Sequence, residues 1–161
     1  MASNTPPSAQ VNRQPLKLIL VPTDFSPGAE PALRWAATIA EPTGAEIALL
    51  HVLDFMTPAM AAGSPDMGVW LDDAMIQEAQ RRAETAIAQQ AARLPRARTV
   101  IREGTPRLEI LEVAKELQVD LIVMGTHGRT GIAHMLIGSV AEHIVRHSPI
   151  AVLTVRQQNT P

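Results

Sequence analysis

The sequence predicts a doubly wound α/β domain: a single five-stranded parallel sheet, in the strand order 3-2-1-4-5, with helices on both faces. The first observation is alternation, because short apolar runs are separated by longer segments whose apolar residues recur at helical spacing. Strict strand–helix alternation favours parallel strands joined by crossover helices. The second observation is size, since 161 residues with 46% hydrophobic content suit one domain with its own core.

The first strand is predicted at residues 16–21, a nearly continuous apolar run that ends at Pro22 and is typical of a strand buried on both faces. The next helix begins at Pro27 or at Pro31. The later start is favoured because Pro31 lacks the N–H that the first turn of the longer helix would use. Gly44 is expected to end this helix. Its predicted apolar face consists of Leu33, Ala36, Ala37 and Ala40.

Residues 47–53 form the predicted second strand, and residues 55–70, rich in Met, Pro, Ala and Gly, form a long connection. Connections of this length are often functional or mobile. Two interpretations stay open: an adaptable lid or partner surface built on its methionines, or a loosely packed loop that covers the sheet edge. A long helix is predicted at residues 71–94, and Pro95 ends it.

The second half of the chain continues the alternation. Residues 98–103 carry charge at both ends, which suits a strand at the edge of a sheet. Thr105 is a favourable N-cap, with Pro106 at the first helical position. The buried face of that helix is predicted at Ile110, Leu111, Ala114 and Leu117. The fourth strand, the last helix and the last strand are predicted at residues 120–124, 140–147 and 150–155.

Composition and chain ends limit the class of protein. Residues 1–15 are polar with three prolines, so we expect a flexible tail, a domain at 16–156, and frayed residues at 157–161. The absence of cysteine excludes disulfides and thiol chemistry. A net charge of −2 without a basic block, and very few aromatic side chains, argue against nucleic-acid binding. No apolar run reaches the length of a membrane span and no secretory signal is visible, so we expect a cytoplasmic protein.

The most informative local pattern is Gly125-Thr126-His127-Gly128, directly after the fourth strand, followed by Gly138-Ser139 at the start of the last helix. Glycines let a backbone approach a bulky anion, and a helix start offers unpaired N–H groups and a positive dipole end. The ends of the first and fourth strands lie where α/β sheets bind ligands. The pattern therefore predicts a nucleotide phosphate site. The alternative is that these are ordinary turn glycines and that Ser139 is a helix cap.

The chain resembles the universal stress protein family in four places, over a match from about Leu16 to Arg156. The glycines and the hydroxyl of the loop fit the family's nucleotide signature, G-x2-G-x9-G-(S/T). The matching segments are Val21-Pro22-Thr23-Asp24-Phe25-Ser26, Leu49-Leu50-His51-Val52, Val123 to Arg129 with Gly138-Ser139-Val140, and Ser148 to Val155.

The resemblance implies a homodimeric, ATP-binding member of the family that acts as a nucleotide-dependent regulatory or stress-response module. It implies that Asp24 contacts the ribose hydroxyls, that Pro22 and Thr23 line the base and sugar pocket, and that backbone at Val52 meets the adenine edge. Met124 and Thr126 belong to the same implied site, with His127 inside its loop. The residues implied to surround the phosphates are Gly125, Gly128, Arg129, Gly138, Ser139 and Val140. Any Mg²⁺ would be held through the phosphates and water, and the dimer would form partly by antiparallel pairing of the closing strands at 150–155.

Several of these side chains have a simpler interpretation. Asp24 is also a residue type that caps helices and forms turns. Arg129 either pairs with phosphate oxygens or is a solvated surface arginine. His127 either donates to a phosphate or stabilises its turn.

The remaining histidines give a weaker signal. His51, in the second strand, is expected to be a satisfied core or interface histidine. His143 and His147 are four residues apart on the last helix, a spacing that suits either a metal pair or a polar face near a helix C-terminus.

Two other functions were compared with nucleotide-dependent regulation. A slow ATP hydrolase or a self-phosphorylating enzyme would use Thr126, Thr130 or Ser139 as hydroxyl acceptors. Efficient catalysis is not indicated, because Asp24 is the one acidic residue near the glycine loop and is assigned to the sugar. A flavin or dinucleotide carrier of similar topology is disfavoured by the scarcity of aromatic side chains.

Overall fold

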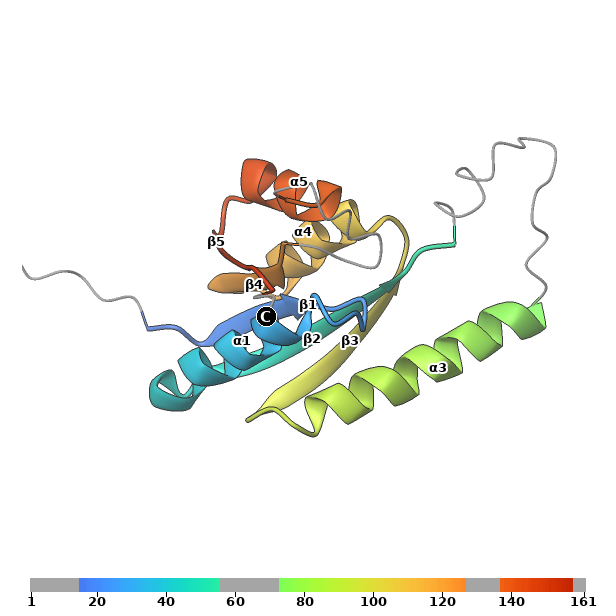
Figure 1. Cartoon of the computed structure of the whole chain (residues 1–161), viewed down its shortest axis with the longest axis horizontal. Coiled ribbons are helices and arrows are strands. Elements are labelled where there is room, and N and C mark those ends of the chain that lie inside the picture. The colour runs from blue at the N-terminus through green and yellow to red at the C-terminus, as the bar shows by residue number, and fades with distance from the viewer. Residues whose placement is uncertain (1–14, 56–72, 127–136, 158–161) are drawn as a thin grey trace, which may run out of the picture.

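The structure, a computed structural model, describes residues 15–55, 73–126 and 137–157. Within these ranges one sheet has the strand order β3-β2-β1-β4-β5, and every neighbouring pair is parallel (Figure 1). The predicted fold class and strand order are therefore confirmed. The elements are β1 (Leu18–Pro22), α1 (Glu30–Thr43), β2 (Glu46–Leu53), α3 (Asp73–Ala91), β3 (Ala97–Glu103), α4 (Pro106–Glu116), β4 (Leu121–Gly125), α5 (Ser139–His147) and β5 (Ala151–Val155).

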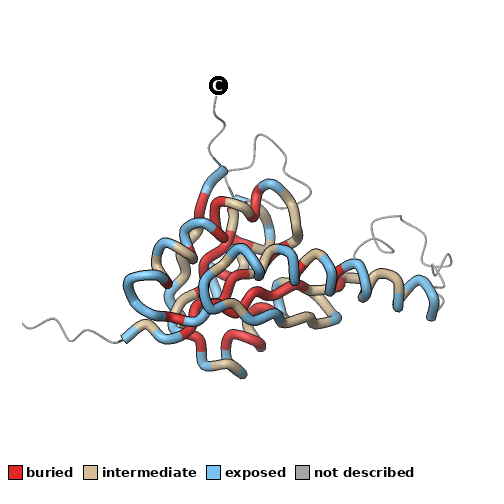
Figure 2. Tube along the Cα trace, turned by 90° about the horizontal axis from the view of Figure 1, so that it is seen from below, coloured by how far each residue is buried: buried red, intermediate tan, exposed pale blue. Residues whose placement is uncertain are grey.

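Alternate residues of the central strands face two separate apolar layers. Ile19 and Val21 of β1 pack with α1 and α3, whereas Leu18 and Leu20 pack with α4 and α5. Figure 2 accordingly shows buried residues along the centre of the molecule and exposed residues on the outer helices. This burial on both faces explains the nearly continuous apolar run of the first strand.

Helix α1 begins at Glu30, with Pro31 in its first turn, so the later of the two predicted starts is confirmed. A proline is tolerated there because the first-turn N–H groups have no intrahelical partner. The helix ends at Gly44, which has φ 72° and donates its N–H to the carbonyl of Ala40. On the predicted apolar face only Ala37 is half-buried rather than buried.

Helix α3 ends at Ala91, three residues before the predicted end at 94. The N–H groups of Arg93 and Leu94 bond to carbonyls three residues earlier, so the chain tightens into turns ahead of Pro95. The predicted start at 71 and the predicted loop after Phe55 lie outside the described residues, as do nearly all of the two predicted tails.

Strand β4 also differs in its start, because Asp120 is not a strand residue. Its Oδ2 accepts hydrogen bonds from the backbone N–H groups of Lys17 and Leu18, at 2.7 and 2.9 Å, and so joins the entry of β4 to the entry of β1. On α4, Val113 is buried, whereas the predicted core residues Leu111 and Leu117 are half-buried.

Strands β3 and β5 form the two edges of the sheet, as the charged ends of β3 indicated. Among the described residues, none of the helices has both the length and the apolar character that crossing a membrane requires.

Candidate functional site

The carboxyl ends of β1 and β4 lie side by side at the middle of the sheet. From β1 the strand order runs outward to β2 and β3 in one direction, and to β4 and β5 in the other. The chain therefore leaves β1 and β4 toward opposite sides. This is the topological switch point at which open α/β sheets bind ligands.

The turn after β1 is closely bonded. The N–H of Thr23 donates to the carbonyl of Leu50 at 2.8 Å, which extends the pairing with β2. Asp24 Oδ1 accepts from the backbone N–H and the hydroxyl of Ser26, at 3.0 and 2.6 Å. Asp24 is thus a turn former, one of its two predicted roles. An ionised carboxylate offers about four acceptor positions, so the Ser26 contacts do not by themselves exhaust it.

His51 lies beneath this turn. Its side chain is only 6% exposed, and its Nδ1 lies 2.8 Å from the carbonyl oxygen of Thr23. Because a carbonyl only accepts, Nδ1 carries the hydrogen and donates it. The prediction of a satisfied core histidine is confirmed. The imidazole also lies against the ring of Phe25, with 4.2 Å between ring centroids.

On the other side of the switch point, the start of α5 is joined to the end of β4. The Thr126 N–H donates to Val155 of β5 at 3.0 Å, and the Gly138 N–H donates to the Thr126 carbonyl at 2.7 Å. Gly138 is the N-cap of α5 with extended backbone and, as a glycine, supplies no side-chain cap. The alternative that Ser139 is the cap is therefore wrong, because Ser139 is the first helical residue. The N-cap residue thus leaves the first N–H groups of α5 without a side-chain acceptor of its own.

The fold brings together the turn that carries Thr23 and Asp24, the end of β4, and the start of α5. Val52 is half-buried on β2, one strand farther from β4. Met124 is 5% exposed and packs in the core against α4 and α5. The predicted loop residues His127, Gly128 and Arg129 lie outside the part of the chain that the structure describes.

The histidine pair on α5 has the geometry of a polar face. The rings of His143 and His147 are stacked with centroids 4.2 Å apart, and His147 Nδ1 lies 2.9 Å from the His143 carbonyl oxygen. The described ranges contain no group of three or more side chains suited to a metal ion. Desolvation, and then the nearby charges of His147, Arg107 and Arg146, lower the pKa of His143 below its ordinary value.

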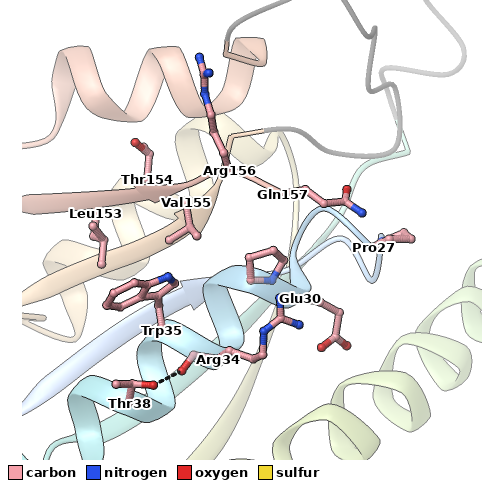
Figure 3. Close-up of a pocket in the computed structure, with 11 residues that line it drawn as sticks. Pro27, Glu30, Arg34, Trp35, Thr38, Leu153, Thr154, Val155, Arg156 and Gln157 are labelled. Carbon is pink, nitrogen blue, oxygen red and sulfur yellow. Dashed lines mark hydrogen bonds between the residues drawn. The ribbon is translucent and has the colours of Figure 1, made fainter. Parts of the chain in front are cut away.

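An open cavity of about 800 Å³ lies elsewhere, between α1 and the end of β5 (Figure 3). We call it the α1–β5 groove. Trp35, which is 52% exposed, forms part of its α1 wall, and Leu153 and Val155 point toward α1 from β5. Its lining residues are Pro27, Glu30, Pro31, Arg34, Trp35, Thr38, Leu153, Thr154, Val155, Arg156 and Gln157. This groove is not predictable from the sequence, because nothing in the pattern of α1 marks its tryptophan as exposed.

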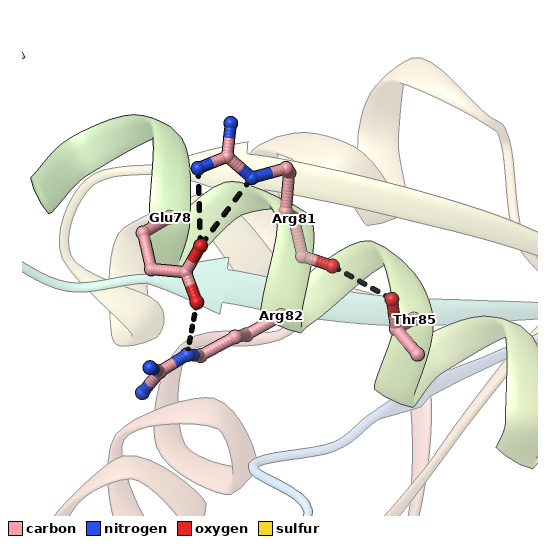
Figure 4. A network of polar contacts seen from close by, with 4 residues as sticks. All are labelled: Glu78, Arg81, Arg82 and Thr85. Atoms are coloured by element: carbon pink, nitrogen blue, oxygen red, sulfur yellow. Dashed lines mark hydrogen bonds and ion pairs between the residues drawn. The ribbon is translucent and has the colours of Figure 1, made fainter. Parts of the chain in front are cut away.

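A second polar cluster lies on the outer face of α3 (Figure 4). Glu78 accepts hydrogen bonds from both Arg81 and Arg82, and these contacts lower the pKa of its carboxyl. All three side chains are exposed to solvent. Exposed ion pairs at this helical spacing contribute little to stability, because water and salt screen the charges. The cluster is therefore a solvated helix face rather than a ligand site.

The fold defines a doubly wound α/β protein, with a candidate ligand site at the switch point of its sheet. The chain belongs to the universal stress protein family, whose sequence profile matches residues 15–156. It is 35% identical over 143 residues to the universal stress protein MJ0531 of Methanocaldococcus jannaschii, covering 88% of this chain and 82% of the relative. It is 31% identical to the universal stress protein MJ0577 of the same organism, covering 89% of this chain and 97% of the relative.

Solved structures agree with this assignment. The structure of MJ0577 matches with a TM-score of 0.72 at 31% identity, and the match covers 91% of this chain and 100% of the MJ0577 chain. A universal stress protein solved in complex with cAMP matches with a TM-score of 0.56 at 26% identity, covering 89% of this chain and 98% of that one.

Proposed function

We propose that this protein binds an adenine nucleotide, ATP in the first instance, at the switch point between β1 and β4. One observation carries the proposal: the hydrogen bond from Gly138 to Thr126 holds the start of α5, whose N-cap is a glycine, against the end of β4. A helix start of this kind favours phosphate. The family assignment supports it, as does the relative that was solved with cAMP.

In this proposal the Asp24 carboxylate accepts the ribose hydroxyls, and Pro22 and Thr23 line the base and sugar pocket. Backbone at Val52 meets the adenine edge. The buried position of Met124 means that it takes part through its backbone or as a wall below the base. The phosphates lie among backbone N–H groups and the Ser139 hydroxyl; the full proposed set is Gly125, Thr126, His127, Gly128, Arg129, Gly138, Ser139 and Val140. Mg²⁺ would be held by the phosphates and water.

The role that follows is that of a regulatory module in the stress response, in which nucleotide binding changes the surface offered to partners. We further propose that two copies pair through β5, and that the protein works in the cytoplasm. Strand β5 supports the pairing, because it is hydrogen-bonded to β4 and forms an edge of the described sheet.

The experiment is a calorimetric titration with ATP and, separately, with inorganic tripolyphosphate, which has phosphates and no ribose. Wild-type protein is expected to bind both. Asp24→Ala removes acceptors of charged hydrogen bonds, each worth about 1.5–3 kcal/mol, and should weaken ATP binding about tenfold or more. Its affinity for tripolyphosphate should stay the same.

Glu84→Ala, on the exposed side of α3, is the matched carboxylate control and should leave both affinities unchanged. Equal loss of ATP and tripolyphosphate in Asp24→Ala would show that Asp24 does not contact the sugar. Failure of the wild-type protein to bind ATP would overturn the proposed function itself. Product analysis of the same samples tests the slow-hydrolase alternative, because steady release of ADP would require it.

A further inference from the structure

The turn after β1 contains a residue with left-handed backbone conformation, Phe25. Phe25 has φ 63°, in the left-handed region that a bulky side chain rarely adopts. This conformation costs free energy, so it is kept only where contacts with neighbouring residues hold it in place. Residues strained in this way cluster at functional sites. Phe25 directly follows Asp24, so whatever holds Phe25 also fixes where the Asp24 carboxylate lies.

Two contacts hold Phe25. Its backbone N–H donates to Thr23 Oγ1 at 3.1 Å, across the residue that carries the carboxylate. Its ring lies against the buried imidazole of His51, with centroids 4.2 Å apart and planes inclined by 31°. One contact fixes the backbone and the other fixes the side chain, and both depend on groups at or below the turn.

Thr23 is in turn held by two other elements. Its hydroxyl donates to Gln90 Oε1, near the end of α3, at 3.0 Å, although the two residues are 67 positions apart. Its carbonyl accepts from His51 Nδ1 at 2.8 Å. With the N–H bonded to Leu50, every polar group of Thr23 has a partner on β2, on α3 or in its own turn.

We propose that His51 and Gln90 are positioning residues that orient the Asp24 carboxylate for the ribose of a bound nucleotide. The inference rests on the proposed function. His51 is buried under the turn and Gln90 reaches it from α3, so both act through Thr23 and Phe25. The Ser26 contacts then set the rotation of the carboxylate on a backbone that His51 and Gln90 have already fixed.

The two functions of His51 can be separated by two variants. His51→Asn keeps an N–H donor close to the position of Nδ1 and removes the ring that supports Phe25. His51→Phe keeps an aromatic ring and removes the donor to Thr23. At the second residue, Gln90→Glu keeps the acceptor for the Thr23 hydroxyl, and Gln90→Leu removes it. Gln89→Leu, at the exposed neighbouring position on α3, is the matched control.

The decisive readout is coupling to Asp24. Titration with ATP should show a loss of about five- to tenfold in Gln90→Leu and in each His51 variant, and little loss in Gln90→Glu and Gln89→Leu. In an Asp24→Ala background the same changes should cost almost nothing, because no carboxylate is left to position. Tripolyphosphate affinity should be unchanged throughout. A residue that only stabilised the fold would instead weaken both ligands in both backgrounds.

Thermal melting of each variant identifies those that fail to fold, and Gln90→Leu is the safer test because Gln90 is half-buried whereas His51 is buried. If wild-type protein binds no ATP, the proposed function fails. If wild-type protein binds ATP, and Gln90→Leu keeps full affinity or loses the same factor in the Asp24→Ala background, the positioning role is wrong.

Discussion

Single residues carry much of the chemistry in this protein, and the histidines show how strongly their neighbours decide it. His51 is buried and donates from Nδ1 to the carbonyl of Thr23 in the β1 turn. His143, on the opposite face of the sheet, is half-buried, and desolvation followed by the nearby charges of His147, Arg107 and Arg146 lowers its pKa. The same residue type therefore supports a rigid turn in one place and a pH-dependent contact in the other.

The lowered pKa of His143 predicts the direction of a pH effect on stability. Unfolded histidine has a pKa of about 6.5, so on acidification the unfolded chain takes up this proton at a higher pH than the folded chain does. Folding stability is therefore lost as the pH falls from about 6.5 toward the lowered pKa of the folded state. His143→Gln should reduce the fall in melting temperature between about pH 7.5 and about pH 5.5. Identical pH profiles for His143→Gln and the wild type would contradict this assignment.

A role for Asp24 could be predicted from the sequence, whereas the role of Gln90 could not. The position of Asp24 at the end of an apolar strand was sufficient to predict its role as a turn former, and its proposed contact with ribose came from the family resemblance. Gln90 carried no such signal, because its bond to Thr23 joins positions 67 apart and depends on how α3 crosses the sheet. Contacts of this kind follow from tertiary packing, which a local pattern does not encode.

At the scale of elements, glycine and proline were the most reliable guides. Pro31 and Gly44 marked the two ends of α1, since each restricts or permits a backbone conformation that a helix terminus needs. The start of β4 differs by one residue from the prediction, because Asp120 directly precedes the strand. Its carboxylate accepts from backbone N–H groups at the start of β1, a bond between distant positions that a local pattern does not encode.

The left-handed end of α1 gives a prediction for stability. Gly44 has φ 72°, and a Cβ placed there would lie 3.3 Å from a guanidinium nitrogen of Arg96. Arg96 can move, so the main cost of Gly44→Ala is backbone strain, which should lower the free energy of unfolding by about 1 kcal/mol or more. Urea denaturation of Gly44→Ala and wild type measures it. An unchanged midpoint with an unchanged slope would show that the helix end relaxes without strain.

At the scale of the whole molecule, the sheet leaves β5 at an edge with the α1–β5 groove beside it. A two-fold dimer brings the same patch of both copies together. Trp35, exposed on the groove wall, would then be covered by the partner copy. The alternation of the sequence was sufficient to predict the parallel sheet, but not this groove, which exists only once α1 and β5 are packed together.

The proposed dimer predicts the effect of a charge at that patch. Trp35→Lys places like charges near each other across the two-fold axis and should convert the dimer to monomers at tens of micromolar protein, as measured by light scattering. Leu108→Lys is the matched control, because Leu108 is similarly exposed, at 51% against 52% for Trp35, but lies on α4 at the other face. A wild-type protein that is monomeric at that concentration, or loss of the dimer in Leu108→Lys alone, would rule out this interface.

The adenine nucleotide is proposed to bind between the turn after β1 and the start of α5. Amide hydrogen exchange, compared between ligand-free and ATP-saturated protein, is the measurement to make first. We expect ATP to slow exchange at Asp24 to Ser26, where it stabilises the turn and its existing hydrogen bonds, and at Ser139 to Ala141, where it covers the first N–H groups of α5. Slowing confined to Trp35 and the rest of the α1–β5 groove, with both of these segments unchanged, would contradict this proposal.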